Sequence, residues 1–421
     1  MDTKENDSKL FTPGPLTTSL TVKQAMLHDL GSRDTIFINI ISYIREKLLE
    51  LADASPDEYT TVLIPGSGTY AVEATFSTSV PRQDAKILII ENGAYGQRMI
   101  KICQALNIPY DVISFGETER VQIDLVANKL KLNTYTHVAI IHCETTSGIL
   151  NPIEEIGQLV YDHGTTKGST VYIVDSMSGF GAIPVSLRNG HITYLISSSN
   201  KCIEGVPGFA FVISKRKHLL TCQGQARSLV LDLYDQYTYM EQSKQFRFTP
   251  PTHTMLAFKR ALDELEQEGG VQGRARRYQN NNRVIRDQMK ALGFVELIKP
   301  EYQTYIITSY YYPPAPFQFQ TFYNKLSDKH QLIYPGKTTV ADCFRIGNIG
   351  RLFENDMITL VTCIKEECLK HERTPAIIEG EALSSRLTQE SIAFQINYFS
   401  ISSTISIDDE IENNKFHITD Y

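Results

Sequence analysis

Short apolar segments that alternate with helical segments are the feature that most limits the fold of this chain. Five of them, at residues 59–64, 85–91, 137–142, 171–175 and 194–197, are rich in Ile, Val and Leu. Segments of that length and composition are typical of buried strands. Apolar residues at helical spacing predict helices at 38–51, 71–76, 255–267 and 274–292. Strands and helices in alternation favour an α/β fold with a mostly parallel sheet and right-handed crossovers.

Polar and aromatic residues follow these strands directly. They are Ser67 to Thr69, Tyr95, Glu144 to Thr146, Asp175 and Lys201. In open α/β sheets, ligands bind beyond the carboxyl ends of the strands. The sequence therefore predicts a ligand site at this edge of the sheet.

Lys201 lies in a polar turn between the strand at 194–197 and a further apolar strand at 209–213. Lysine is normally exposed because burying its ammonium group is costly. Between two buried strands the group is partly desolvated, which lowers its pKa and gives a nucleophilic amine suited to a Schiff base. The alternative interpretation is an ordinary lysine on an exposed turn.

The turn at residues 65–70, Pro-Gly-Ser-Gly-Thr-Tyr, joins a strand to a helix. Free amides and the helix dipole favour an anion at such a point. The turn lacks the third glycine of a dinucleotide fingerprint and the lysine of a P-loop, so it suits a single phosphate. A plain strand–helix turn is the alternative. Thr249 and Thr252 precede another helix, where they could face an anion or simply cap the helix.

Three further residues have two interpretations each. Tyr95 is flanked by glycines that leave its ring open for stacking, although an aromatic residue at a strand end is usually part of the core. Asp175 could be a turn cap rather than a catalytic acid. Arg345 lies inside an apolar strand and must meet an anion there, either a structural carboxylate or a substrate.

The chain of 421 residues is long enough for two domains or three. We expect an N-terminal arm at 1–20, a large domain at 21–265 and a smaller α+β domain at 266–370 with strands at 305–311 and 343–346. Residues 371–421 form an acidic tail with three basic and nine acidic residues. We expect this tail to be poorly ordered, although 392–398 alternates like a strand.

Charge and cysteine content limit the functional classes. The net charge is −7, and the tail accounts for six of these charges, so the nearly neutral body makes nucleic-acid binding improbable. The seven cysteines include no C-x-x-C pair, which argues against zinc and disulfides and favours a reducing compartment. A polar N-terminus and the lack of a long apolar run indicate a cytoplasmic protein that does not span a membrane.

Several stretches together resemble the class V, fold-type-I aminotransferases that use pyridoxal 5′-phosphate (PLP), and they span roughly residues 10–370. They are Thr-Pro-Gly-Pro-Leu-Thr-Thr (12–18), Gly-Ser-Gly-Thr-Tyr-Ala-Val-Glu-Ala (66–74), Asn-Gly-Ala-Tyr-Gly (92–96), Glu-Thr-Thr-Ser-Gly-Ile-Leu-Asn-Pro (144–152), Ser-Ser-Asn-Lys-Cys-Ile-Glu-Gly-Val-Pro-Gly-Phe-Ala-Phe (198–211), Arg-Phe-Thr-Pro-Pro-Thr-His-Thr (247–254), Tyr-Pro-Gly-Lys (334–337) and Asp-Cys-Phe-Arg-Ile-Gly-Asn-Ile-Gly (342–350). The loop at 162–169 is slightly longer than in the family, and the tail beyond 370 matches nothing in it.

The resemblance implies a role for each matching residue. Lys201 would bind the cofactor covalently and move the proton, while Asp175 would pair with the protonated ring nitrogen. The other implied contacts are Tyr95 stacked on the ring, Thr145 or Thr146 at its 3′ oxygen, Ser67, Gly68, Thr69 and Asn200 at the phosphate, and Thr249 from the partner subunit of a homodimer. Gly14 and Arg345 would hold the anionic end of a small-molecule substrate.

Three alternatives stay open on the sequence. The first is another transaminase of the same family whose substrate is a carboxylate, because Arg345 could bind a carboxylate as well as another anion. A cysteine desulfurase is disfavoured because Cys202 adjoins the lysine instead of lying on a mobile loop, and because Tyr95 stands where that branch typically has histidine. A non-catalytic binding protein of the same fold is disfavoured by the intact pair of Lys201 and Asp175.

Overall fold

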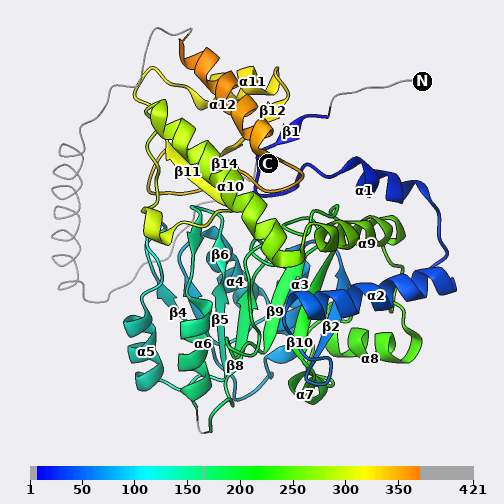
Figure 1. Cartoon of the computed structure of the whole chain (residues 1–421). Helices are drawn as coiled ribbons and strands as arrows, with labels where there is room; N and C mark the ends of the chain where they lie inside the picture. The colour runs from blue at the N-terminus through cyan, green and yellow to red at the C-terminus, as the bar shows by residue number, and fades with distance from the viewer. Residues whose placement is uncertain (1–6, 165, 370–421) are drawn as a thin grey trace, which may run out of the picture. The chain divides into compact units, whose positions relative to one another are not determined.

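A seven-stranded sheet is the centre of the computed structural model, which describes residues 7–164 and 166–369 (Figure 1). Its order is β2 (Tyr59–Pro65), β10 (Phe209–Lys215), β9 (Tyr194–Ser198), β8 (Val171–Asp175), β5 (His137–Ile141), β3 (Ile87–Glu91) and β4 (Tyr110–Ser114). Only β10 runs antiparallel to its neighbours. The predicted mostly parallel sheet is confirmed.

Two details of this sheet were not predicted. Edge strand β4 has only partly buried or exposed side chains, so it lacks the apolar run that marks the other strands. β10 is antiparallel because only residues 199–208 separate it from β9. A parallel return needs a longer crossover connection.

Helices cover the sheet, with α5 and α6 toward the β4 end and α2 and α8 toward the β2 end in Figure 1. Their bounds are α1 (Leu20–Gln24), α2 (Thr35–Leu51), α3 (Gly68–Ser79), α4 (Ala94–Ala105), α5 (Ile123–Leu132), α6 (Ile153–Asp162), α7 (Arg216–Leu219), α8 (Leu233–Ser243) and α9 (Thr252–Gln267). The predicted helices are present but begin earlier than expected. For α2 the reason is Asp34, whose side chain accepts a hydrogen bond from Ile36 N at 2.8 Å and caps the helix.

A second, smaller sheet has the order β11 (Ile307–Tyr311), β14 (Cys343–Gly347) and β13 (Tyr334–Pro335). The helices around it are α10 (Gly270–Ala291), α11 (Phe319–Ser327) and α12 (Glu354–Leu369). β1 (Lys9–Leu10) pairs with β12 (Gln331–Leu332), so the N-terminal segment runs along this unit. A short hairpin of β6 (Cys143–Glu144) and β7 (Ile149–Leu150) follows β5.

The two largest apolar clusters belong to different sheets, although a smaller cluster joins residues of both units, such as Cys202 and Tyr278. The largest cluster of buried apolar side chains draws only on residues 22–265, and the next draws on Phe11 and residues 284–364. This separation supports the predicted division near residue 265, which stays a prediction. The acidic tail at 371–421, including the possible strand at 392–398, lies outside the described residues.

No helix in the described part of the chain is long and apolar enough to cross a membrane.

Candidate active site

The carboxyl ends of the central strands are level with one another. Asp175, the last residue of β8, pairs with Ile141 at the end of β5 and with Ile196 of β9. Lys201 follows β9, Tyr95 follows β3, and Ser67 follows β2, which runs in the same direction. The predicted ligand-binding residues therefore gather at one edge of the sheet.

Eight of these residues line a single cavity of about 200 Å³: Ser67, Gly68, Thr69, Tyr95, Thr145, Asp175, Asn200 and Lys201. Thr146 is buried beside the cavity, where its hydroxyl accepts a hydrogen bond from Ala94 N at 2.9 Å. Thr249 is exposed and does not line the cavity. Its predicted reach into the site of a partner subunit stays a prediction.

The amine of Lys201 points toward the N-terminal segment. Its Nζ donates a hydrogen bond to Pro13 O at 2.6 Å, and a Cβ at Gly14 would collide with the lysine side chain. Gly14 has φ +126°, a conformation that favours glycine. Burial, aided by the charge of Lys337, lowers the pKa of Lys201 below its ordinary value despite the nearby Tyr95, Cys202 and Asp175. A larger fraction of the amine is therefore neutral and nucleophilic.

Asp175 is 7% exposed and forms no ion pair with any described residue. Its Oδ1 accepts a hydrogen bond from Met177 N at 2.9 Å. Burial raises the pKa of this carboxyl to about 6. The charges of Arg98 and Lys201 act on this carboxyl without outweighing its burial. A buried carboxylate that borders a cavity and forms no ion pair fits a ligand with a protonated nitrogen.

The start of α3, in contrast, is suited to bind an anion. Ser67 is the N-cap residue, yet its side chain makes no capping hydrogen bond. The hydroxyl and the first amides of the helix are therefore available to a ligand. Asn200 accepts a hydrogen bond from Ser198 Oγ at 3.0 Å, which fixes its amide in the same cavity.

Arg345, on β14, is 1% exposed and pairs with no carboxylate among the described residues. Its Nε donates to Pro335 O at 3.0 Å, and its Nη1 donates to Thr145 O at 2.7 Å. The interpretation as a structural ion pair therefore loses support. The charge of the buried Glu144 acts on Arg345 from beyond ion-pair distance, and the N–H groups of Arg345 that bind no carbonyl suit an external anion.

Residues that the sequence analysis missed complete the site. Arg98 donates to Thr69 Oγ1 at 2.9 Å, and its guanidinium lies 4.9 Å from the centre of the Tyr95 ring. It follows Tyr95 by three residues on α4, and this helical spacing was the available signal. Met177 lines the same cavity, and its side chain abuts Gly68 so closely that a Cβ there would clash.

Glu144, which the sequence analysis noted without assigning it a role, is fully buried. Its Oε1 accepts hydrogen bonds from Thr146 N (3.0 Å) and Thr146 Oγ1 (2.5 Å), whereas its Oε2 has no hydrogen-bond partner in the described part of the chain. Burial raises the pKa of Glu144 to about 7. The carboxyl thus fixes the turn that carries Thr145 and Thr146.

Behind Lys201, a buried ion network supports the loop. Arg274, on α10, is fully buried and donates through Nη1 to Cys202 O. Its Nη1 lies 3.4 Å from Glu204 Oε1, and its Nε donates to Glu268 Oε2 at 2.8 Å. Arg277 binds the same two carboxylates. The network ties the lysine loop to the first helix of the smaller unit.

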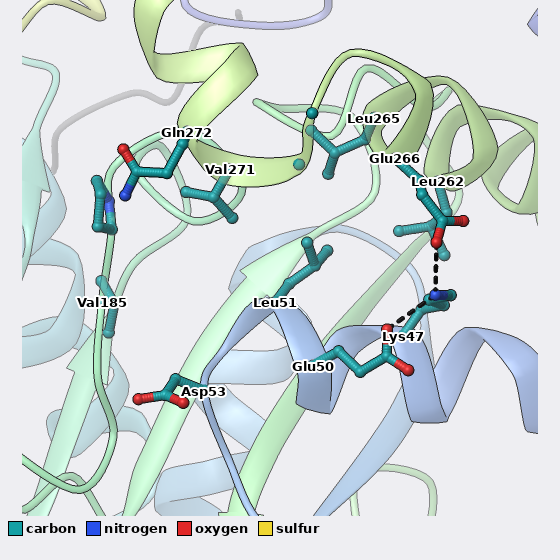
Figure 2. Close-up of a pocket in the computed structure, with 13 residues that line it drawn as sticks. Lys47, Glu50, Leu51, Asp53, Val185, Leu262, Leu265, Glu266, Val271 and Gln272 are labelled. Carbon is teal, nitrogen blue, oxygen red and sulfur yellow. Dashed lines mark hydrogen bonds and ion pairs between the residues drawn. The ribbon is translucent and has the colours of Figure 1, made fainter.

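A second cavity, of about 520 Å³, lies between the ends of α2 and α9 and the start of α10 (Figure 2). Lys47 Nζ lies 2.8 Å from Glu50 Oε2 and 3.1 Å from Glu266 Oε1, so this charge is already paired. None of the predicted ligand-binding residues lines this cavity.

The sequence matches the family model described as "Aminotransferase class-V" over residues 19–313. It is 48% identical to a 2-aminoethylphosphonate–pyruvate transaminase of Bacteroides fragilis. The 360 aligned residues are 85% of this chain and 98% of that protein. A transaminase of the same name from Salmonella paratyphi B is also 48% identical over 360 residues, which is 85% of this chain and 96% of that protein.

Among solved structures, the fold is similar to that of ureidoglycine–glyoxylate aminotransferase from Bacillus subtilis. The TM-score is 0.79 at 19% identity, with 90% of this chain and 97% of that chain covered. With the family model matching most of its length, the chain belongs to the class V aminotransferases.

Proposed function

We propose that this chain is a PLP-dependent aminotransferase that moves the amino group of 2-aminoethylphosphonate to pyruvate, giving phosphonoacetaldehyde and L-alanine. The observation that carries the proposal is one cavity that joins a lysine of lowered pKa, an unpaired buried aspartate and a helix start suited to phosphate. The identity of 48% to transaminases of that activity supports the choice of substrates.

The residues of the cavity fit the cofactor at both of its charged ends. Asp175 would hold the proton on the ring nitrogen, and Ser67, Gly68, Thr69 and Asn200 would bind the phosphate. Tyr95 would stack on the ring, and Thr145 or Thr146 would contact its 3′ oxygen. When bound, the cofactor supplies a carbonyl that reacts with an amine and a ring that accepts negative charge from the amine-bearing carbon.

Proton movement falls to Lys201. Its Nζ, with a lowered pKa, would take the proton from the amine-bearing carbon of the substrate and return it on the cofactor side. Asp175 would keep the ring nitrogen protonated throughout, which makes the loss of that carbon-bound proton easier. Gly14 and Arg345 would hold the anionic end of the substrate, so that the reacting carbon stays near Nζ.

Two measurements test the proposal against its alternatives. The purified protein should show the visible absorption of a lysine-bound cofactor, which a non-catalytic protein of the same fold would lack. L-Alanine should form from pyruvate much faster with 2-aminoethylphosphonate than with serine or other amino acids as donor. If amino acids served equally well, the chain would be another class V transaminase, of the alanine–glyoxylate or serine–pyruvate kind.

We further propose that the protein is a homodimer with shared sites. Leu229 (74% exposed), Val230 (61%) and Phe248 (48%) are large exposed apolar residues. Phe248 adjoins Thr249, and Arg247 Nη1 donates a hydrogen bond to Leu229 O at 3.2 Å, which links the two stretches. A second copy would cover these side chains and bring Thr249 to the phosphate of the neighbouring site. Light scattering of the purified protein tests this: a monomer at micromolar concentration would exclude it. A cytoplasmic location is likewise proposed, because all seven cysteines have free thiols.

A further inference from the structure

Positive charge is concentrated around Tyr95. Besides the guanidinium of Arg98, Lys337 Nζ lies 5.4 Å from the centre of the Tyr95 ring. Burial acts to raise the pKa of the Tyr95 hydroxyl, yet its pKa is lowered on balance. Lys201, Lys337, a hydrogen bond with Thr145 and Arg345 together outweigh the burial. The space beside this hydroxyl therefore attracts anions.

Arg345 alone can neutralise only one negative charge of an anion bound beside Tyr95. Two of its five N–H groups are used by main-chain carbonyls, one from Nε to Pro335 and one from Nη1 to Thr145. These bonds fix the guanidinium plane, and they leave one positive charge for a ligand. One charge matches a carboxylate.

Lys337 is positioned to supply a second charge. It lies two residues after Pro335, whose carbonyl binds Arg345. Its loop is held by Gly336 N, which donates to Cys343 O at 2.8 Å, and by Thr339 N, which donates to Glu117 Oε2 at 2.6 Å. Lys337 is exposed and forms no ion pair with any residue in the described ranges 7–164 and 166–369. Its charge lies against Tyr95 and helps to lower the pKa of Lys201, but no described carboxylate neutralises it.

We propose that Lys337 determines the preference of the site for a phosphonate over a carboxylate, by acting as a second cation beside Arg345. The inference rests on the proposed function and goes beyond it by assigning substrate selection to one residue. A phosphonate has three acceptor oxygens and, like a phosphate monoester, carries up to two negative charges near neutral pH. A carboxylate has two oxygens and a single charge, which Arg345 already balances.

The test compares two amine donors that react with the same form of the enzyme, 2-aminoethylphosphonate and L-alanine. In Lys337→Met, kcat/KM for 2-aminoethylphosphonate should fall about 10- to 100-fold, mainly through KM, since a hydrogen-bonded charge is lost. For L-alanine it should change less than about threefold. Lys337→Arg should recover most of the loss. Added salt should weaken 2-aminoethylphosphonate binding more in the wild type than in Lys337→Met.

Lys217→Met is the matched control. Lys217 is also exposed and follows the antiparallel strand β10, so it lies at the opposite edge of the sheet. The Lys217→Met substitution should leave kcat/KM unchanged for both 2-aminoethylphosphonate and L-alanine. An equal loss for both donors in Lys337→Met, or no loss for either, would overturn the inference while leaving the proposed function intact. If the wild type does not use 2-aminoethylphosphonate at all, the proposed function fails first, and the inference fails with it.

Discussion

Replacing Asp175 by asparagine should have opposite effects on the stability of the protein without cofactor and on the activity of the loaded enzyme. Burial raises the pKa of the carboxyl from 3.8 to about 6. Because the folded-state pKa is raised, ionisation opposes folding, and stability is lost as pH rises from about 4 through about 6. At 1.36 kcal/mol per pH unit, the ionised carboxylate costs the cofactor-free protein about 3 kcal/mol at pH 8.

Asparagine keeps the oxygen that accepts the hydrogen bond from Met177 N, but it cannot ionise. The cofactor-free variant should therefore be more stable than the wild type at pH 8, by up to about 3 kcal/mol, and no more stable at pH 4. Urea unfolding of both proteins at several pH values measures this. Other titrating groups are common to both proteins, so the difference between the two curves isolates Asp175.

The loaded enzyme should respond in the other direction, because an amide cannot hold a proton on the ring nitrogen by charge. We expect a barrier higher by several kcal/mol in the half-reaction with 2-aminoethylphosphonate, and a smaller loss of cofactor affinity. Asp57→Asn is the control, since Asp57 is exposed and precedes β2 at the far edge of the sheet. Parallel stability curves together with an unchanged half-reaction would show that Asp175 only caps its strand.

Substitutions at three further residues test other parts of the structure. Lys201→Ala should abolish turnover and the visible absorption of the bound cofactor while leaving a folded protein, as judged by circular dichroism; substantial turnover would disprove its role. Arg345→Lys should raise KM for the amine donor and for pyruvate together, and Arg345→Ala should cost roughly 2–5 kcal/mol in binding. A large drop in melting temperature with unchanged KM would instead make Arg345 structural. Arg274→Met should destabilise the protein by about 3–5 kcal/mol, because it leaves Glu204 and Glu268 with one buried cation fewer; a change below 1 kcal/mol would contradict this.

The order of strands and helices could be predicted from the sequence, because the pattern of apolar residues in each stretch shows which of its side chains are buried. β8 is buried along its whole length, and its apolar run from Val171 to Val174, followed by Asp175, predicted both of its ends. The same local information identified Lys201, Asp175 and the turn at Ser67 as a site, because each directly follows a strand. Capping by Asp34 shows the limit of this reasoning. A hydrogen bond from one side chain moved the start of α2 by three residues from the expected position.

Contacts between distant segments were decided only by the tertiary structure. The partly exposed strand β4 has no sequence signal of its own and exists because β3 offers it hydrogen bonds. The sequence predicts that Arg345 is buried. Only the structure shows that its guanidinium contacts the carbonyl of Thr145, 200 residues away, and not a carboxylate. Lys337 resembles any exposed lysine until the fold places it against Tyr95. The burial pattern of each stretch determines which helix or strand it forms. Which charged side chains come together depends on contacts between distant stretches, and no single stretch of sequence contains that information.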